Sequence, residues 1–209
     1  MFKKDNFFKD YSISAKKYYI NLKKTKKVYN NFINDLNNGQ IPLLKSYEND
    51  YDFDFSKETI EKYSKYKNIV IIGMGGSILG AKTIYSFFKK KIKKKIFFLD
   101  NLDSNFEYMK IKNLKNVCFV LVSKSGNTLE SITNFKILFS KKLFNNKLII
   151  ITETNDNKLM SIANKYNAEI IEHKEFIGGR FSVMSETGMF PAALMNLNLK
   201  KFKNLKKLL

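Results

Sequence analysis

The sequence predicts an α/β fold in which about five parallel strands form one sheet with helices on both faces. Uninterrupted runs of β-branched and other apolar residues recur from residue 68 onward, and amphipathic segments separate them. Strands that are apolar on both sides are typical of a parallel sheet covered on each face. The alternation of the two patterns therefore indicates a doubly wound, flavodoxin-like sheet.

The strands and helices follow one another in chain order. The runs rich in isoleucine, valine, leucine and phenylalanine predict strands at Ile69–Ile72, Ile96–Leu99, Val117–Val122, Leu148–Ile151 and Ala168–Ile171. Apolar residues at helical spacing predict helices at Ser77–Phe88, Phe106–Ile111, Leu129–Phe144 and Asn157–Tyr166. In the last of these, Lys158 and Lys165 are expected on the exposed face.

The segment before the sheet is predicted to be largely helical. Residues 1–44 are expected to form an N-terminal helical extension, because apolar residues recur from Tyr18 to Leu36 and Asn37-Asn38-Gly39 ends the pattern. An acidic loop follows at Glu48–Asp54, and Ser56 is the expected N-cap of another helix. Residues 45–197 then make up the α/β domain.

The last twelve residues have the pattern of an amphipathic helix. Leu199, Phe202 and Leu205 lie at helical spacing, and the sequence ends on two leucines with no capping signal. We expect residues 198–209 to be the start of a helix that leads into a further, C-terminal domain. A natural helical tail is the alternative.

Composition narrows the class of protein. With 209 residues, of which 44% are hydrophobic and 14% aromatic, the chain is long and apolar enough to bury a core. The net charge of +19 comes from lysines spread along the whole chain, and Arg180 is the one arginine among 38 basic residues. Proteins that recognise nucleic acid usually rely on arginine, so we expect no nucleic-acid partner.

Two features of the sequence bear on the cellular compartment of the protein. No apolar run approaches the roughly 20 residues that a membrane span requires, and no targeting segment is evident, so we expect no membrane partner. The single cysteine, Cys118, lies in an apolar strand and has no partner for an internal disulfide. A cytoplasmic location is therefore expected.

The first candidate site is the glycine-rich turn Gly73-Met74-Gly75-Gly76-Ser77-Ile78-Leu79-Gly80. Glycines after a strand let the backbone approach a ligand, and the following helix points free N–H groups at it. Ile78 stands where a dinucleotide fingerprint needs its third glycine, and no Gly-Lys-Ser/Thr of a P-loop follows. Gly76 and Ser77 thus favour an anion site, with a plain turn capped by Ser77 as the alternative.

The second candidate site is Ser123-Lys124-Ser125-Gly126-Asn127-Thr128. The hydroxyls of Ser123, Ser125 and Thr128, together with the N–H groups that open the next helix, are suited to hold a phosphate. Lys124 adds positive charge but is free to point outward, and a capped helix start without a ligand is the alternative.

The third candidate site is Ile177-Gly178-Gly179-Arg180-Phe181-Ser182. A guanidinium that never deprotonates can stabilise a carbonyl or enediolate oxygen, and the paired glycines bring the backbone close. A structural ion pair or a chance arginine is the alternative.

His173, the only histidine, is expected at the surface or in packing, and no residue spacing suggests a metal site.

Together these segments resemble the glucose-6-phosphate isomerase family of the wider sugar isomerases. Similar motifs occur in that family in the same order, over about residues 45–209, and Gly-Gly-Arg-Phe-Ser is the most specific of them. The resemblance implies that Gly76, Ser77 and the Ser123–Thr128 loop, including Lys124, Gly126 and Asn127, bind the sugar phosphate. It assigns Gly179 and Arg180 to the reacting end of the sugar.

Two functions are compatible with this resemblance. One is the cofactor-free, reversible isomerisation of glucose 6-phosphate to fructose 6-phosphate, with this chain supplying the phosphate-binding half of an enzyme expected to be a homodimer at full length. The other is a non-catalytic sugar-phosphate sensor. The family's catalytic glutamate and histidine have no match here, so we expect this chain alone to be inactive. Glu186 stands where a small residue or proline is expected, and this change is predicted to affect only a loop.

Overall fold

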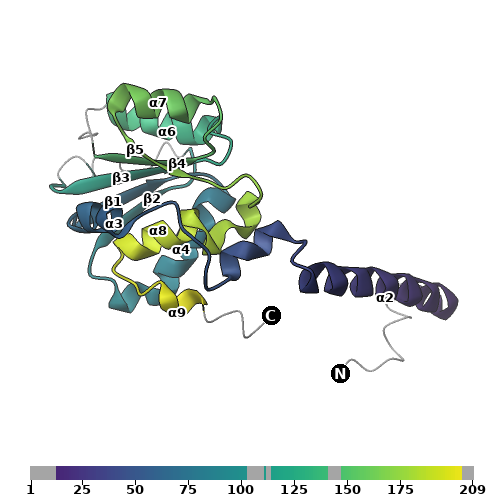
Figure 1. Ribbon diagram of the computed structural model, residues 1–209. Coiled ribbons are helices and arrows are strands. Elements are labelled where there is room, and N and C mark those ends of the chain that lie inside the picture. The colour runs from purple at the N-terminus through teal and green to yellow at the C-terminus, as the bar shows by residue number, and fades with distance from the viewer. Residues whose placement is uncertain (1–12, 103–110, 112–113, 141–146, 204–209) are drawn as a thin grey trace. The chain divides into compact units, whose positions relative to one another are not determined.

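The computed structural model in Figure 1 describes residues 13–102, 111, 114–140 and 147–203. The chain divides into two compact units, Met1–Pro42 and Leu43–Leu209. In the first unit, helix α2 (Ala15–Asn37) begins after Ser14, whose hydroxyl accepts a hydrogen bond from the Lys17 N–H. None of the residues of α2 is buried within the structure.

The second unit is built on one five-stranded parallel sheet. Its strands are β1 (Asn68–Ile72), β2 (Lys95–Leu99), β3 (Val117–Val122), β4 (Leu148–Thr152) and β5 (Glu169–Glu172). They lie in the order β2-β1-β3-β4-β5, and every neighbouring pair is parallel. This is the doubly wound, flavodoxin-like order that the sequence predicts, and the direction of winding reverses between β1 and β3.

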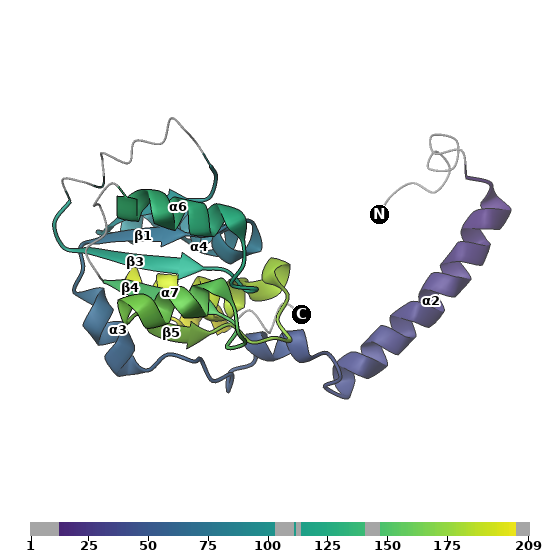
Figure 2. The same ribbon diagram turned by 90° about the horizontal axis from the view of Figure 1, so that it is seen from above.

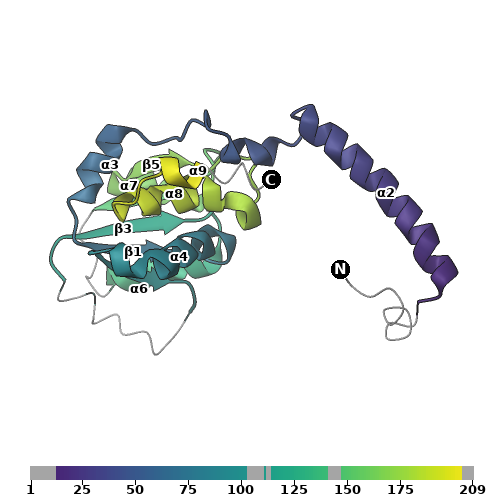
Figure 3. The same cartoon turned by 90° about the horizontal axis from the view of Figure 1, so that it is seen from below.

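Helices cover both faces of the sheet (Figure 1). One face carries α6 (Leu129–Ser140) and α7 (Lys158–Tyr166), as the view from above shows (Figure 2). The other face carries α3 (Lys57–Ser64), α4 (Gly76–Phe88) and α8 (Glu186–Leu194), which are seen from below in Figure 3.

The two faces of the sheet bury separate cores because successive strand residues point in opposite directions. Val70, Ile72 and Leu121 pack with residues of α6 and α7. Ile69, Ile71 and Val120 pack on the other face with residues of α3, α4 and α8. The strands β1, β3 and β4 are buried along their whole length, which explains their uninterrupted apolar sequence.

Short helical segments complete the fold. They are η1 (Pro42–Tyr47), η2 (Lys89–Lys91), η3 (Gly179–Met184) and α9 (Lys200–Lys203). Helix α8 and the turns η1 and η3 do not figure among the predicted elements. All nine residues of α8 are buried, so its sequence has no helical alternation, and Pro191 lies inside it. In the described ranges no helix is both long and apolar enough to cross a bilayer.

Most of the predicted boundaries lie within one or two residues of the observed ones. The predicted helix Phe106–Ile111 and the ends of the helices predicted at Leu129–Phe144 and 198–209 fall largely or partly outside the described residues. The assignment of residues 198–209 to the start of a further domain stays a prediction.

Candidate functional site

The three motifs lie at the carboxyl-terminal edge of the sheet, where β1, β3 and β5 end. The glycine-rich turn connects β1 to α4, the serine loop connects β3 to α6, and the arginine segment follows β5 and forms η3. The first two flank the position where the winding reverses between β1 and β3, which is where doubly wound sheets bind their ligands.

Gly76 brings the first motif against the third. A Cβ atom added to Gly76 would lie 2.2 Å from the Gly179 carbonyl oxygen and 2.8 Å from the Arg180 nitrogen. Only a residue without a side chain allows this contact between the start of α4 and the start of η3. The N-cap of α4 is Gly75, not Ser77, and Ser77 lies in the first turn of the helix.

The Ser182 side chain reinforces this contact. Its buried hydroxyl donates to the Gly179 carbonyl at 2.7 Å and lies 3.4 Å from the Gly76 carbonyl oxygen. Thr187 in turn donates to the Ser182 carbonyl at 2.8 Å, and its hydroxyl lies 2.9 Å from the Ser182 hydroxyl. These bonds hold Gly179 and Arg180 on a rigid base.

The serine loop is fixed by its own hydrogen bonds. The hydroxyls of Ser123 and Thr128 lie 2.7 Å apart, and Gly126 donates to the Ser123 carbonyl at 3.1 Å. Gly126 has a φ of +64°, and a Cβ there would lie 1.9 Å from Asn157 Oδ1. The exposed Ser125 and Asn127 and the half-buried Thr128 precede the free N–H groups of α6. This arrangement can accept an anion.

Lys124 is directed to the segment that precedes the arginine. Its ammonium donates to the Glu175 carbonyl at 2.6 Å and lies 3.5 Å from the Glu153 carboxylate. Beside this lysine, His173 is buried, and burial lowers the pKa of its imidazole. His173 is therefore a packing residue, as expected, and Lys124 connects the second motif to the segment just before the third.

Arg180 borders an open pocket of about 340 Å³ between α4 and η3, which Gly76, Gly80 and Gly179 also line. The guanidinium is exposed and lies 5.7 Å from the centre of the Phe181 ring. None of the described residues that line this pocket carries a carboxylate or an imidazole. The pocket thus offers a permanent positive charge beside the backbone of Gly76 and Gly179, and no described lining group suited to move a proton.

Neither a metal cluster nor a reactive thiol stands out. The described residues contain no group of three or more histidine, cysteine, aspartate or glutamate side chains placed to hold a metal ion. Cys118 is fully buried in β3, and burial raises the pKa of its thiol to about 12. A thiol with this pKa is inert at neutral pH.

Comparison with known proteins agrees with the order and placement of the motifs. The family model described as phosphoglucose isomerase matches residues 55–209. The chain belongs to the phosphoglucose isomerase family. Its three motifs thus occupy the carboxyl edge of a phosphoglucose isomerase domain.

Two curated relatives illustrate the similarity. The glucose-6-phosphate isomerase of Methanocaldococcus jannaschii is 32% identical over 203 residues, which cover 92% of this chain and 49% of that protein. The glucose-6-phosphate isomerase of Mesomycoplasma hyopneumoniae strain J is 34% identical over 194 residues, or 82% of this chain and 45% of that protein. The chain therefore spans about half the length of these relatives.

A solved structure shares the fold. A hypothetical protein from Thermus thermophilus superposes with a TM-score of 0.64 at 23% identity, over 72% of this chain and 39% of that one. This likeness supports the doubly wound architecture of the phosphoglucose isomerase domain.

Glu186 corrects one expectation from the sequence. The structure places it in the first turn of α8, with no exposed surface, rather than in a loop. The Tyr51 hydroxyl lies 2.9 and 3.0 Å from its two carboxylate oxygens, and the Asp54 N–H donates to one of them at 3.3 Å. Burial raises the pKa of Glu186, and the hydrogen bonds to its carboxylate oppose that rise.

Local sequence patterns give little indication of the contact between Tyr51 and Glu186. Tyr51 and Glu186 lie 135 positions apart, and neither belongs to a recognisable motif. The replacement of a small residue at position 186 was the one available signal. In this member of the phosphoglucose isomerase family, the Tyr51–Glu186 pair holds the 48–55 segment against the helix that follows Arg180.

We expect Gly76→Ala to destabilise the fold by about 2 kcal/mol or more, because its methyl group would overlap the Gly179 backbone. Gly179→Ala is the matched control, since no atom lies within 4 Å of its added Cβ, and it should change stability by no more than about 0.5 kcal/mol. Urea unfolding of both variants measures the difference. Equal stabilities would contradict the tight contact.

A second prediction concerns pH. The pKa of Glu186 in the folded protein is raised above its ordinary value of 4.5, so the folded state holds the proton more tightly than the unfolded state does. The free energy of unfolding that comes from this difference is fully present below pH 4.5 and is lost as the pH rises through the folded-state pKa. Glu186→Gln removes this loss, so its stability relative to the parent should increase as pH rises above 4.5. Urea unfolding from about pH 4, near the usual glutamate pKa, up to about pH 8 measures this.

Two further variants make the pH experiment specific. Glu61→Gln changes an exposed carboxylate and should show no such trend. Tyr51→Phe removes a donor to the carboxylate, so it should cost about 1.5–3 kcal/mol where Glu186 is ionised and less where it is protonated. A pH-independent difference for Glu186→Gln would contradict the prediction.

Proposed function

We propose that this chain forms the phosphate-binding part of an enzyme that reversibly isomerises glucose 6-phosphate and fructose 6-phosphate. The observation that carries the proposal is the meeting of the three motifs at one edge of the sheet, with Gly76 held against Gly179 and Arg180. Membership of the phosphoglucose isomerase family supports it, as do relatives named glucose-6-phosphate isomerase. The sensor alternative gains no comparable support.

The proposed binding mode places the phosphate at the serine loop. Ser125 and Thr128 offer hydroxyls beside the N–H groups that open α6, and Ser77 lies in the first turn of α4. Two helix starts that converge on one anion favour it electrostatically. Gly126 and Asn127 shape the turn, and Lys124 contributes charge from its position beside Glu153.

Arg180 is proposed to act at the other end of the sugar. Isomerisation moves a proton between C1 and C2 through an enediolate, and negative charge develops on the oxygen atoms of these carbons. A guanidinium on a rigid base stabilises that charge without having to reorganise. The proton itself needs a base, and none of the described residues around the Arg180 pocket supplies one. The inactivity of this chain alone therefore stays a prediction.

Other expectations from the sequence also stay predictions. They are the absence of a cofactor, the homodimer at full length, the absence of a nucleic-acid partner and the cytoplasmic location.

We expect replacement of both Ser125 and Thr128 by alanine to weaken fructose 6-phosphate binding by about 3 kcal/mol, or roughly a hundredfold, because two hydrogen bonds to a charged group are lost. Isothermal titration calorimetry measures the affinity. Thr25→Ala with Ser86→Ala, two exposed positions elsewhere, is the matched control. Thr128→Ser, which keeps the hydroxyl that meets Ser123, should retain affinity. Unchanged binding by a folded double variant would rule the phosphate site out.

Arg180→Lys should lower kcat by about a hundredfold or more and leave the affinity for sugar phosphate nearly unchanged, because a guanidinium is lost from the charge-developing end. The measurement is a coupled assay on enzyme with isomerase activity, with binding followed in parallel. Lys82→Arg, which exchanges an exposed base outside the pocket, is the control. Lost affinity at normal turnover would reassign Arg180 to the phosphate.

A further inference from the structure

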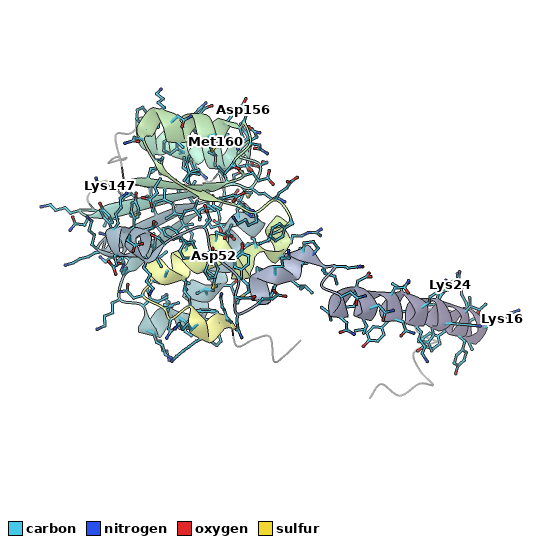
Figure 4. All side chains as sticks on the ribbon, in the orientation of Figure 1. Lys16, Lys24, Asp52, Lys147, Asp156 and Met160 are labelled. Atoms are coloured by element: carbon cyan, nitrogen blue, oxygen red, sulfur yellow. The ribbon has the colours of Figure 1, made fainter. Side chains whose placement is uncertain are left out.

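A second pocket lies at the opposite, amino-terminal edge of the sheet. Its volume is about 760 Å³, and it is lined by the segments that precede β1, β2 and β3, namely residues 64–68, 93–95 and 114–116. These three strands are adjacent in the order β2-β1-β3, so the sheet brings the three segments together. Figure 4 labels Lys147, just before β4, at this same edge.

Lysine dominates the lining of this amino-edge pocket. Lys65, Lys67, Lys93, Lys94, Lys95 and Lys115 all border it, and no aspartate or glutamate does so among the described residues. The ion pairs described in the structure use other lysines, Lys62, Lys82, Lys124 and Lys174. Six lysines among eleven lining residues is a far higher density than 37 lysines in 209 residues, so general enrichment does not account for it.

Hydrogen bonds to backbone atoms hold together the segments that carry these lysines. The Lys95 N–H donates to the Lys67 carbonyl at 3.0 Å, and the Asn68 side chain donates to the Lys115 carbonyl at 2.7 Å. Lys94 is half-buried and its ammonium donates to the Ser64 carbonyl, while burial lowers its pKa. Like charges gathered in this way repel one another, and a multiply charged anion relieves that repulsion.

We propose that the amino-edge pocket binds a compact chain of phosphates, as found in inorganic tripolyphosphate or in the triphosphate of a nucleotide. Ammonium groups are point-charge donors suited to phosphate oxygens, and six of them match an anion with several charges better than a single phosphate. The pocket is bounded by three short segments, which fits a compact anion and not an extended strand of nucleic acid.

This site is separate from the sugar-phosphate site. The two lie at opposite ends of strands such as β1, whose five residues span about 17 Å at roughly 3.3 Å per residue. The proposal is therefore independent of the isomerase function, and a failure of one leaves the other untouched.

The test is isothermal titration calorimetry of the 209-residue protein with tripolyphosphate at low salt. Lys65→Gln, Lys93→Gln and Lys115→Gln combined remove one exposed lysine from each segment of the pocket. We expect the Kd to rise about tenfold or more, because screened lysine–phosphate contacts are lost. The control is a triple variant that changes the net charge by the same amount at exposed positions outside the pocket, namely Lys89→Gln, Lys90→Gln and Lys136→Gln. It should alter the Kd less than about twofold.

Titrations with other anions identify the kind of ligand. Orthophosphate should bind far more weakly than tripolyphosphate. Equal affinity for ATP and tripolyphosphate supports recognition of the phosphate chain alone, and tighter binding of ATP supports a nucleotide. Saturating fructose 6-phosphate should leave the tripolyphosphate affinity unchanged.

Several results would overturn the proposal. They are no binding of tripolyphosphate by the parent, equal weakening in the pocket and control variants, displacement by fructose 6-phosphate, or displacement by a short single-stranded oligonucleotide that binds more tightly. Circular dichroism of both triple variants confirms that they are folded before the comparison is made.

Discussion

The candidate site depends on one contact in which two backbones meet without a side chain between them. Gly76, at the start of α4, lies against the carbonyl of Gly179, and the Ser182 hydroxyl donates to that same carbonyl. This contact joins the turn after β1 to the segment after β5, which are separated by two other strands in the sheet. It fixes the backbone of Arg180 relative to the start of α4, while Lys124 separately links the serine loop to the segment that precedes η3.

Parallel strands explain why so much of this arrangement follows from local sequence. The buried strands β1, β3 and β4 need apolar residues on both sides, so they are visible as continuous runs such as Asn68–Ile72. Their carboxyl ends must share an edge, which places the glycine turn and the serine loop together once the winding order is known. The fold and the neighbourhood of the motifs were therefore predictable.

Other features depend on tertiary contacts that leave little trace in local sequence. Helix α8 is buried on every side, so its residues show no helical period, and Pro191 argues against a helix. The burial of Glu186 depends on Tyr51, whose position relative to α8 no short-range pattern encodes. The direction of Lys124, toward the Glu175 carbonyl, likewise depends on a segment 51 residues away. Sequence patterns identified the candidate loops, and only the folded chain shows which contacts hold them in place.

The pairing of Tyr51 with Glu186 also has a consequence for the order of events on the ribosome. The two residues are 135 positions apart, so at roughly 5–20 residues per second translation takes about 7–27 s to pass from one to the other. During that interval the 48–55 segment has no α8 to bind, and the nascent sheet lacks the helix that covers part of one face. Chaperones that shield apolar strands would be most useful to this protein in that interval.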